Sequence, residues 1–146
     1  MSEYNLKNGI VALSHDKVWD NAKKEWRLKE IYIKEYDTCL CGHYPIKEIC
    51  VLHNHVNNTN AIVGNCCVKK FIDTMPDKIF TSVKRVIEDD TKNLNTATLQ
   101  FATQHGWIRD KDINFYGSIY KKRSLSAKQQ KWKVDINRKV IAKMKR

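Results

Sequence analysis

Two short stretches, Cys39-Leu40-Cys41-Gly42-His43 and Gly64-Asn65-Cys66-Cys67, decide how the first half of this chain folds. Together they hold four of its five cysteines, and each contains a glycine. Thiolates paired in this way are the soft ligands that a tetrahedral zinc site needs from a short piece of chain. Gly42 permits the tight turn that would direct both sulfurs of the first stretch to one side. The sequence therefore predicts a zinc site that joins the two ends of the segment between these stretches.

The candidate ligands outnumber the four positions around a zinc ion. We expect Cys39, Cys41 and Cys67 to bind the metal, and His43 to be the fourth ligand. A thiolate at Cys67 would lie at a helix N-terminus, where the helix dipole lowers the pKa of a thiol. With so many candidates a closed, structural site is easy to build, whereas a catalytic site keeps one position open for water.

Cys66, His55 and Cys50 are alternatives for the fourth position. Cys66 is less suitable, because two adjacent cysteines can rarely both reach one ion without strain. Cys50 stands in a β-branched stretch, and this context favours a packed core thiol. Buried structural cysteines without any metal are the alternative to the whole site.

The hydrophobic period changes along the chain from that of strands to that of helices. We predict the following elements: a helix over 16–27 capped by Ser14, strands over 28–36, 47–54 and 61–63, a helix capped by Asn65 with Val68, Phe71 and Ile72 on one face, and helices over 77–89, 95–105, 110–120 and from 126 onward. Asn95 is expected to cap the helix over 95–105, and Gly106 is expected to end it. Ser126 and Gln129 are expected to form a capping box at the start of the last helix.

This order predicts an α+β fold. Its first part, residues 1–75, would combine an N-terminal helix with a small zinc-braced β-hairpin or sheet of treble-clef-like form. Its second part, residues 76–146, would be helical and end in a basic amphipathic helix. We expect the two parts to form one compact unit.

The net charge of +11 is concentrated at the C-terminus. Residues 121–146 carry eleven Lys and Arg against one acid, whereas the first 120 residues carry sixteen bases and fifteen acids. A concentrated cationic face attracts polyanions, while scattered charge mainly aids solubility. The predicted nucleic-acid contacts are Lys121, Lys122, Arg123, Lys128, Lys131, Arg138, Lys139, Lys145 and Arg146.

The last predicted helix is amphipathic. Trp132, Ile136, Val140 and Met144 follow one another at i+4 spacing and would dock on the core, which leaves most of the cations on the other faces. Nucleic-acid binding explains this face best, and a membrane-surface helix or a merely solvated face are the alternatives. Four nearby aromatic residues could stack on bases or belong to the core: Trp107, Phe115, Tyr116 and Tyr120.

Other features restrict the compartment and the chemistry. No apolar run approaches the ~20 residues that span a bilayer, and the N-terminus has no signal-peptide pattern. We therefore expect an intracellular protein with reduced cysteines that is neither secreted nor membrane-bound. His53-Asn54-His55 spells the letters of HNH nucleases without their spacing, and no catalytic triad or phosphate loop stands out. Nothing in the sequence requires an enzyme.

The chain resembles a loosely defined group of small viral and phage zinc-binding proteins. The resemblance lies in Glu25-Trp26, Cys-x-Cys-Gly-His at 39–43, Gly-x-x-Cys-Val-x-x-Phe at 64–71 and Leu-Ser-x-Lys-Gln at 125–129. It implies Cys39, Cys41 and Cys67 as ligands, Cys66 as dispensable, and a role in nucleic-acid transactions. For a viral protein the location would be the host cytoplasm or nucleus.

Together these features predict a zinc-stabilised, non-enzymatic protein that binds DNA or RNA with low sequence specificity through its basic C-terminal helix. Two alternatives stay open: an adaptor that binds host or viral proteins, and an HNH-like metal-dependent nuclease.

Overall fold

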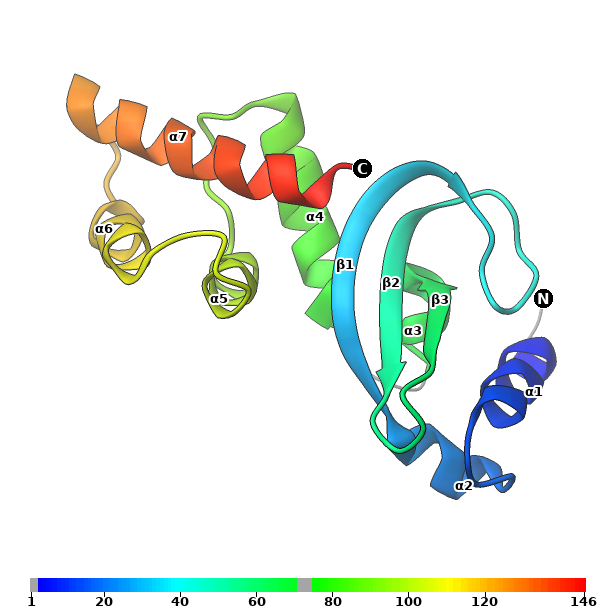
Figure 1. Ribbon diagram of the computed structural model, residues 1–146. Coiled ribbons are helices and arrows are strands. Elements are labelled where there is room, and N and C mark those ends of the chain that lie inside the picture. The colour runs from blue at the N-terminus through cyan, green and yellow to red at the C-terminus, as the bar shows by residue number, and fades with distance from the viewer. Residues whose placement is uncertain (1–2, 71–74) are drawn as a thin grey trace. The chain divides into compact units, whose positions relative to one another are not determined.

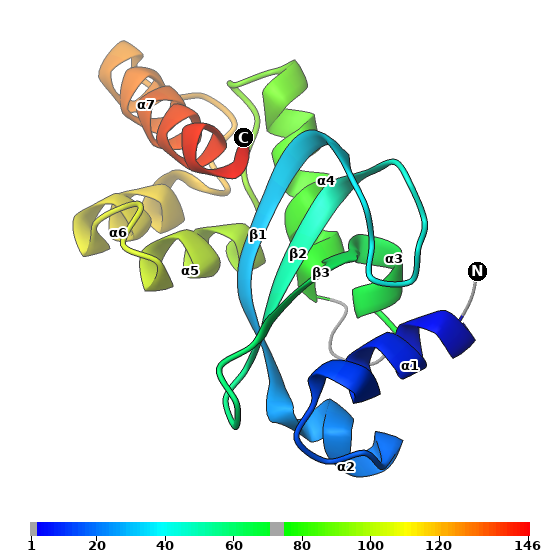
Figure 2. The same cartoon turned by 45° about the vertical axis from the view of Figure 1, so that its right-hand side comes forward.

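The structure is a computed structural model that describes residues 3–70 and 75–146 (Figures 1 and 2). It divides into two compact units, which we call the N-terminal unit (Met1–Asp77 with Arg146) and the C-terminal unit (Lys78–Lys145). The N-terminal unit contains an antiparallel sheet with short helices, and the C-terminal unit is helical. The expected α+β class is therefore confirmed. Phe71 and Ile72, predicted on a helix face, lie outside the described residues.

The sheet of the N-terminal unit has three strands in the order β1-β2-β3: β1 (Trp26–Asp37), β2 (Ile46–Asn54) and β3 (Asn60–Gly64). All neighbours are antiparallel, and Cys50 of β2 faces Ile31 on one side and Val63 on the other. The long β1 strand curves around the sheet in Figure 1, and its pairing with β2 shifts register twice. The three predicted strands are confirmed, each slightly longer than expected.

Both faces of this sheet are covered. Ile49, Cys50, Val51 and Leu52 are consecutive residues of β2 and are all buried. Side chains alternate between the two faces of a strand, so four buried residues in a row require packing on both sides. Tyr32, Ile49 and Val51 form the cluster on one face, with the half-buried Ile46 and Ile62 packed against it.

The helices before the sheet differ from the prediction. The structure has α1 (Glu3–Leu13), α2 (Trp19–Ala22) and a 3-10 turn (Lys23–Glu25) in place of one helix over 16–27. Ser14 is not a cap: its hydroxyl donates to the Ile10 carbonyl and accepts from Trp26 Nε1. Tertiary packing of the buried Trp26 indole has overridden the local signal. Helix α1 was not predicted, because only two of its apolar residues, Leu6 and Ile10, are fully buried and the apolar period is therefore short.

Glu25 ties this region to the tip of the sheet. Its carboxylate accepts hydrogen bonds of 2.8 Å from the His15 N–H, the Asp16 N–H and the Asn54 side-chain amide. The bond from Asn54 is the main cause that lowers the pKa of Glu25, and burial opposes it. A buried acid is tolerated here because three donors satisfy its charge.

The C-terminal unit is built from α4 (Met75–Glu88), which spans the boundary between the units, α5 (Thr96–Gln104), α6 (Asp110–Ile119) and α7 (Ala127–Met144). The four helices predicted here are confirmed within two residues at each end. Asn95 caps α5 by accepting the Thr98 N–H, and Ser126 with Gln129 forms the expected capping box. Gly106, at φ 71°, follows the end of α5 in the left-handed conformation that glycine adopts easily.

A polar network fixes the interior of this unit. The buried Tyr116 hydroxyl donates to Asn137 Oδ1 and accepts the Leu94 N–H, both at 2.8 Å. Asn137 Nδ2 in turn donates to the carbonyls of Asp90 and Lys92. Burial is the main cause that raises the pKa of Tyr116 to about 12. Within the described residues, no helix combines the length and the apolar character needed to cross a membrane.

Candidate metal centre

The loop between β1 and β2 forms a tight knuckle over residues 39–43. The Cys39 N–H donates to the His43 carbonyl at 3.0 Å, and the Gly42 N–H donates to the Cys39 carbonyl at 2.8 Å. Gly42 has a φ of +96°, a conformation that side-chain-bearing residues rarely adopt. A Cβ atom on Gly42 would meet nothing within 4 Å, so the turn itself requires the glycine.

The knuckle is fastened to the end of β3. The Leu40 N–H donates to the Ile62 carbonyl at 2.9 Å, and the Gly64 N–H donates to Cys39 Sγ at 3.3 Å. The short helix α3 (Asn65–Val68) begins directly after Gly64, which is its N-cap. The expected cap, Asn65, instead donates from its side chain to the carboxylates of Glu48 and Asp77. Two charged acceptors attract the amide more strongly than the helix end does.

Three cysteines come together where these segments meet. The sulfurs of Cys39, Cys41 and Cys67 all lie within 4.8 Å of one another, and the Cys39 and Cys67 sulfurs are 3.5 Å apart. Cys39 and Cys41 are buried, and Cys67 is half-buried. We call these residues the three-cysteine cluster. They are the three ligands predicted with most support, and the geometry allows them to hold a metal ion.

Without a metal, the thiols of the cluster differ in pKa. Burial raises the pKa of Cys41, but hydrogen bonds from the His43 backbone N–H and from the thiols of Cys39 and Cys67 outweigh it and lower this pKa. Burial and the two neighbouring sulfurs raise the pKa of Cys67 well above its ordinary value. The expected lowering at Cys67 is therefore wrong for the metal-free protein, because burial and the two neighbouring sulfurs outweigh any effect of the four-residue helix α3.

The other candidate ligands lie outside the cluster. None of the donor atoms of His43, His55, Cys50 or Cys66 belongs to the group within 4.8 Å. His43, His55 and Cys66 are exposed, while Cys50 is fully buried in β2. Burial is the main cause that raises the pKa of Cys50 to about 12, as for a core thiol. A fourth ligand is not among the grouped atoms of the described chain, and His43 stays a prediction.

Helix α1 supports the knuckle from outside. A Cβ atom on Gly9 would lie 2.8 Å from Leu40 Cγ, so the helix backbone approaches the knuckle at Gly9. Asn5 Nδ2 also donates to the Cys41 carbonyl at 3.4 Å. Figure 2 shows α1 below the loop between β1 and β2. The sequence pattern did not predict this support, although a glycine inside a helical segment indicates a close approach of the backbone.

The histidines of the HNH-like letters do not form a metal site in the described structure. His53 lies in β2, where its Nδ1 is 2.7 Å from Asn60 Oδ1 across the hairpin. His55 is exposed in the following turn, and its backbone N–H donates to the Glu25 carbonyl. In the described ranges, three or more His, Cys, Asp or Glu donors gather only at the three-cysteine cluster.

The predicted basic surface lies on the C-terminal unit and at residue 146. Ile136, Val140 and Met144 are fully buried, as expected for the apolar stripe of α7, but Trp132, the first residue of the predicted stripe, is exposed. Ten of the eleven basic residues in 121–146 are exposed, and Lys133 is buried. Three of the ten form ion pairs: Lys131 with Asp135, Arg138 with Asp90 and Arg146 with Glu30.

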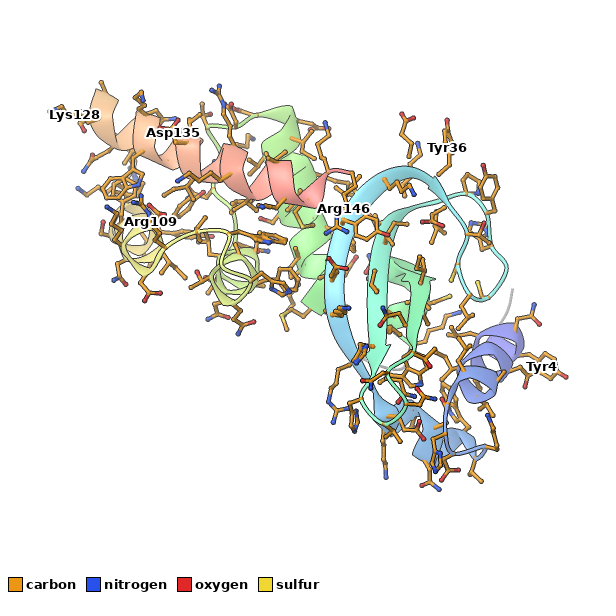
Figure 3. All side chains as sticks on the ribbon, in the orientation of Figure 1. Tyr4, Tyr36, Arg109, Lys128, Asp135 and Arg146 are labelled. Carbon is orange, nitrogen blue, oxygen red and sulfur yellow. The ribbon has the colours of Figure 1, made fainter. Side chains whose placement is uncertain are left out.

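Seven exposed cations have no ion pair with any described residue. We call them the free cations: Lys121, Lys122, Arg123, Lys128, Lys139, Lys143 and Lys145. Arg146 is further occupied, because its guanidinium lies 4.3 Å from the ring centre of Tyr32 and its backbone N–H donates to the Ile33 carbonyl. Figure 3 shows Arg146 beside β1. The structure thus divides the predicted contact residues into available and occupied ones.

The fold and the site define an α+β protein with a three-cysteine cluster that can hold a metal ion. Comparison with models of protein families, with curated proteins and with solved structures finds no match.

Proposed function

We propose that this protein is a zinc-stabilised, non-enzymatic nucleic-acid-binding protein of viral type, which binds DNA or RNA with low sequence specificity. The observation that carries the proposal is the set of seven free cations on α7 and directly before and after it. Cations without an acidic partner can neutralise phosphates, and each phosphate contact releases condensed counterions. The viral origin rests on the sequence resemblance alone.

Zinc is the metal that suits the three-cysteine cluster. Thiolates prefer zinc to the hard cations, and a tetrahedron with Zn–S distances of about 2.3 Å has edges of about 3.8 Å. The separation of 3.5 Å between the Cys39 and Cys67 sulfurs is close to that edge. His43 is the proposed fourth ligand, since its backbone N–H already contacts the Cys41 thiol. The ion would fasten the knuckle to α3 and contribute to the folding of this unit.

Metal analysis of the purified protein tests the zinc site. We expect about one equivalent of zinc per chain, because the cluster is one site. Less than about half an equivalent, in protein purified under reducing conditions without chelator, would contradict the assignment.

A test of nucleic-acid binding needs variants that lose positive charge but keep the fold. Deletion of residues 121–146 would remove Ile136, Val140 and Asn137 from the interior, so it cannot separate binding from folding. The triple variant Lys121→Gln, Lys122→Gln and Lys139→Gln removes three free cations that have no packing role. A matched control, with Lys24, Lys47 and Lys70 changed to Gln, removes three exposed cations from the N-terminal unit.

Affinity for labelled DNA and RNA is measured by fluorescence anisotropy at several salt concentrations. We expect wild-type affinity to fall steeply with salt, and the triple variant to reduce the slope of log K against log salt by about 2 to 3. The control variant should change the slope by less than about 1. Equal slopes for the triple variant and the wild type would refute the proposed surface.

A further inference from the structure

Trp132 is an aromatic residue on the surface of α7. Its exposed fraction is 37%, and among the described Phe, Trp and Tyr residues of the C-terminal unit it is the only one that is exposed. Its indole lies parallel to the Phe115 ring of α6, with the ring centres 3.9 Å apart and the planes 10° from parallel. Of the four aromatic residues expected to stack on bases, Tyr116 is fully buried and Phe115 serves as the support of Trp132.

The indole is fixed in this orientation by a buried acid. Trp132 Nε1 donates to Asp112 Oδ1 at 3.0 Å, and the Asp112 side chain is fully buried. Arg109 also donates to the Asp112 carboxylate, through Nε at 3.1 Å and through its backbone N–H at 3.0 Å. Burial raises the pKa of Asp112, but the hydrogen bonds from Arg109 and Trp132 lower it far more. A ring held in place before binding loses little conformational entropy when it binds.

Exposed cations border the ring. Lys128 lies one helical turn before Trp132 on α7, and Lys111 lies one turn before Phe115 on α6. The Arg109 side chain is 58% exposed although it pairs with Asp112. Figure 3 shows Arg109 at the start of α6, where it is the N-cap, and Lys128 at the start of α7. The nearby exposed acids are Asp110 and Asp135, and Asp135 is paired with Lys131.

We propose that the Trp132–Phe115 pair is a stacking platform for an unpaired base, and that the ligand of the C-terminal unit is single-stranded nucleic acid. This inference rests on the proposed nucleic-acid binding and names its substrate class. A flat ring flanked by cations matches a nucleotide, in which a flat base lies beside a phosphate. In a duplex the base faces are stacked on one another and only the phosphates are presented. An acidic peptide would use the cations without needing the ring.

The test uses the full-length protein, a short labelled oligothymidylate and a labelled DNA duplex of the same length. Stacking of one base on an aromatic side chain contributes roughly 5- to 150-fold to affinity. Trp132→Ala should therefore weaken oligothymidylate binding by roughly this factor and leave duplex binding within about 2-fold. Trp132→Phe keeps an aromatic face and should retain most of the affinity, although it lacks the N–H that Asp112 accepts.

Ile87→Ala is the matched control, because Ile87 is 39% exposed in the same unit and carries no ring. It should leave both affinities unchanged. Thermal unfolding of each variant shows whether the C-terminal unit is intact. If Trp132→Ala is poorly folded, a folded Trp132→Phe that loses its affinity for oligothymidylate would contradict the platform.

Four results would overturn the inference. Equal oligothymidylate binding by the wild type and Trp132→Ala would show that the ring is not a platform, while the cationic surface could still bind nucleic acid. An equal loss of duplex and oligothymidylate binding would show a general role of Trp132. Loss of binding to polyglutamate on Trp132→Ala, with no effect on oligothymidylate, would assign the surface to a protein. Failure of the wild type to bind any nucleic acid would refute the proposed function as well.

Discussion

Cys66 and Cys67 are adjacent in the sequence but have different surroundings in the structure. Cys67 brings its sulfur to within 3.5 Å of the Cys39 sulfur, whereas Cys66 is exposed. Both belong to the first turn of α3, where neighbouring side chains point about 100° apart. One of the two can therefore face the knuckle while the other faces solvent. At the scale of the single residue, the direction of a side chain decides which thiol can be a ligand.

This difference gives the first prediction. Cys67→Ser should abolish stoichiometric zinc binding, because it removes one of three grouped thiols, whereas Cys66→Ser should retain about one equivalent. Metal content after dialysis, together with the charge-transfer absorption of the Co²⁺-substituted protein, measures both variants. Equal zinc loss in the two variants would mean that Cys66 also contributes to the site.

Glu25 gives a prediction about pH. Its pKa is lower in the folded protein than in the unfolded chain, chiefly because of the hydrogen bond from Asn54. The stabilisation is therefore fully present above the unfolded pKa of about 4.3 and is lost as the pH falls through the lower folded value. We expect Glu25→Gln to be less stable than the wild type at pH 7, and the difference in unfolding free energy to shrink below about pH 4.

Urea unfolding at several pH values measures this difference. Glu35→Gln is the control, because Glu35 is an exposed acid of β1 that lies outside the loop held by Glu25. A wild-type advantage over Glu25→Gln that stays constant from pH 7 to about pH 3 would contradict the assigned role.

Among the elements, α1 makes one especially close contact with the knuckle. Its backbone approaches Leu40 of the knuckle at Gly9, and a larger side chain there would displace Leu40. Leu40 stands between the two knuckle cysteines, so the packing of α1 and the position of the sulfurs are linked through one residue. Helix α7 differs from α1 in this respect. Its capping box and its buried apolar residues both favour the same helix, and both could be recognised in the sequence.

The third prediction concerns this contact. Gly9→Val should lower the unfolding free energy by about 1–3 kcal/mol, because the added carbons overlap the Leu40 side chain. The double variant Gly9→Val with Leu40→Ala makes room and should be less destabilised than the sum of its single variants. Denaturant unfolding of the four proteins measures the coupling. Strictly additive losses would show that Gly9 and Leu40 are not packed together.

At the scale of the whole molecule, the two units are stabilised in different ways. The N-terminal unit combines a small three-stranded sheet with the three-cysteine cluster, whereas the C-terminal unit has helices around a buried polar network. A metal ion at the cluster would stabilise only the unit that contains it. The buried network of Tyr116 and Asn137 needs no metal.

The fourth prediction follows from this division. Removal of zinc by a chelator should lower the unfolding temperature of the N-terminal unit and leave the helical signal of the C-terminal unit largely intact. Calorimetry separates the two transitions, and far-ultraviolet circular dichroism follows the helices. A single transition that moves as a whole would show that the units unfold together.

The parts of the fold that the sequence predicted share one property: local and tertiary preferences agree. Asn95 and Ser126 are good caps at the starts of apolar helical periods, and the structure uses them as caps. Ser14 and Asn65 have the same local signal, but a buried indole and two carboxylates recruit their side chains instead. Long-range partners of this kind cannot be seen in a local pattern.

The amino-acid sequence by itself determined the strands, the later helices, the cationic C-terminus and the three cysteines able to share a metal ion. These features depend on residue type and spacing within short segments. Only the tertiary structure decided which cations lack an ion-pair partner among the described residues. It left Trp132 exposed, stacked on Phe115 and hydrogen-bonded to Asp112. It also placed Glu25 and Gly9 in their roles. Such features depend on contacts between segments far apart in the chain, and folding alone brings those segments together.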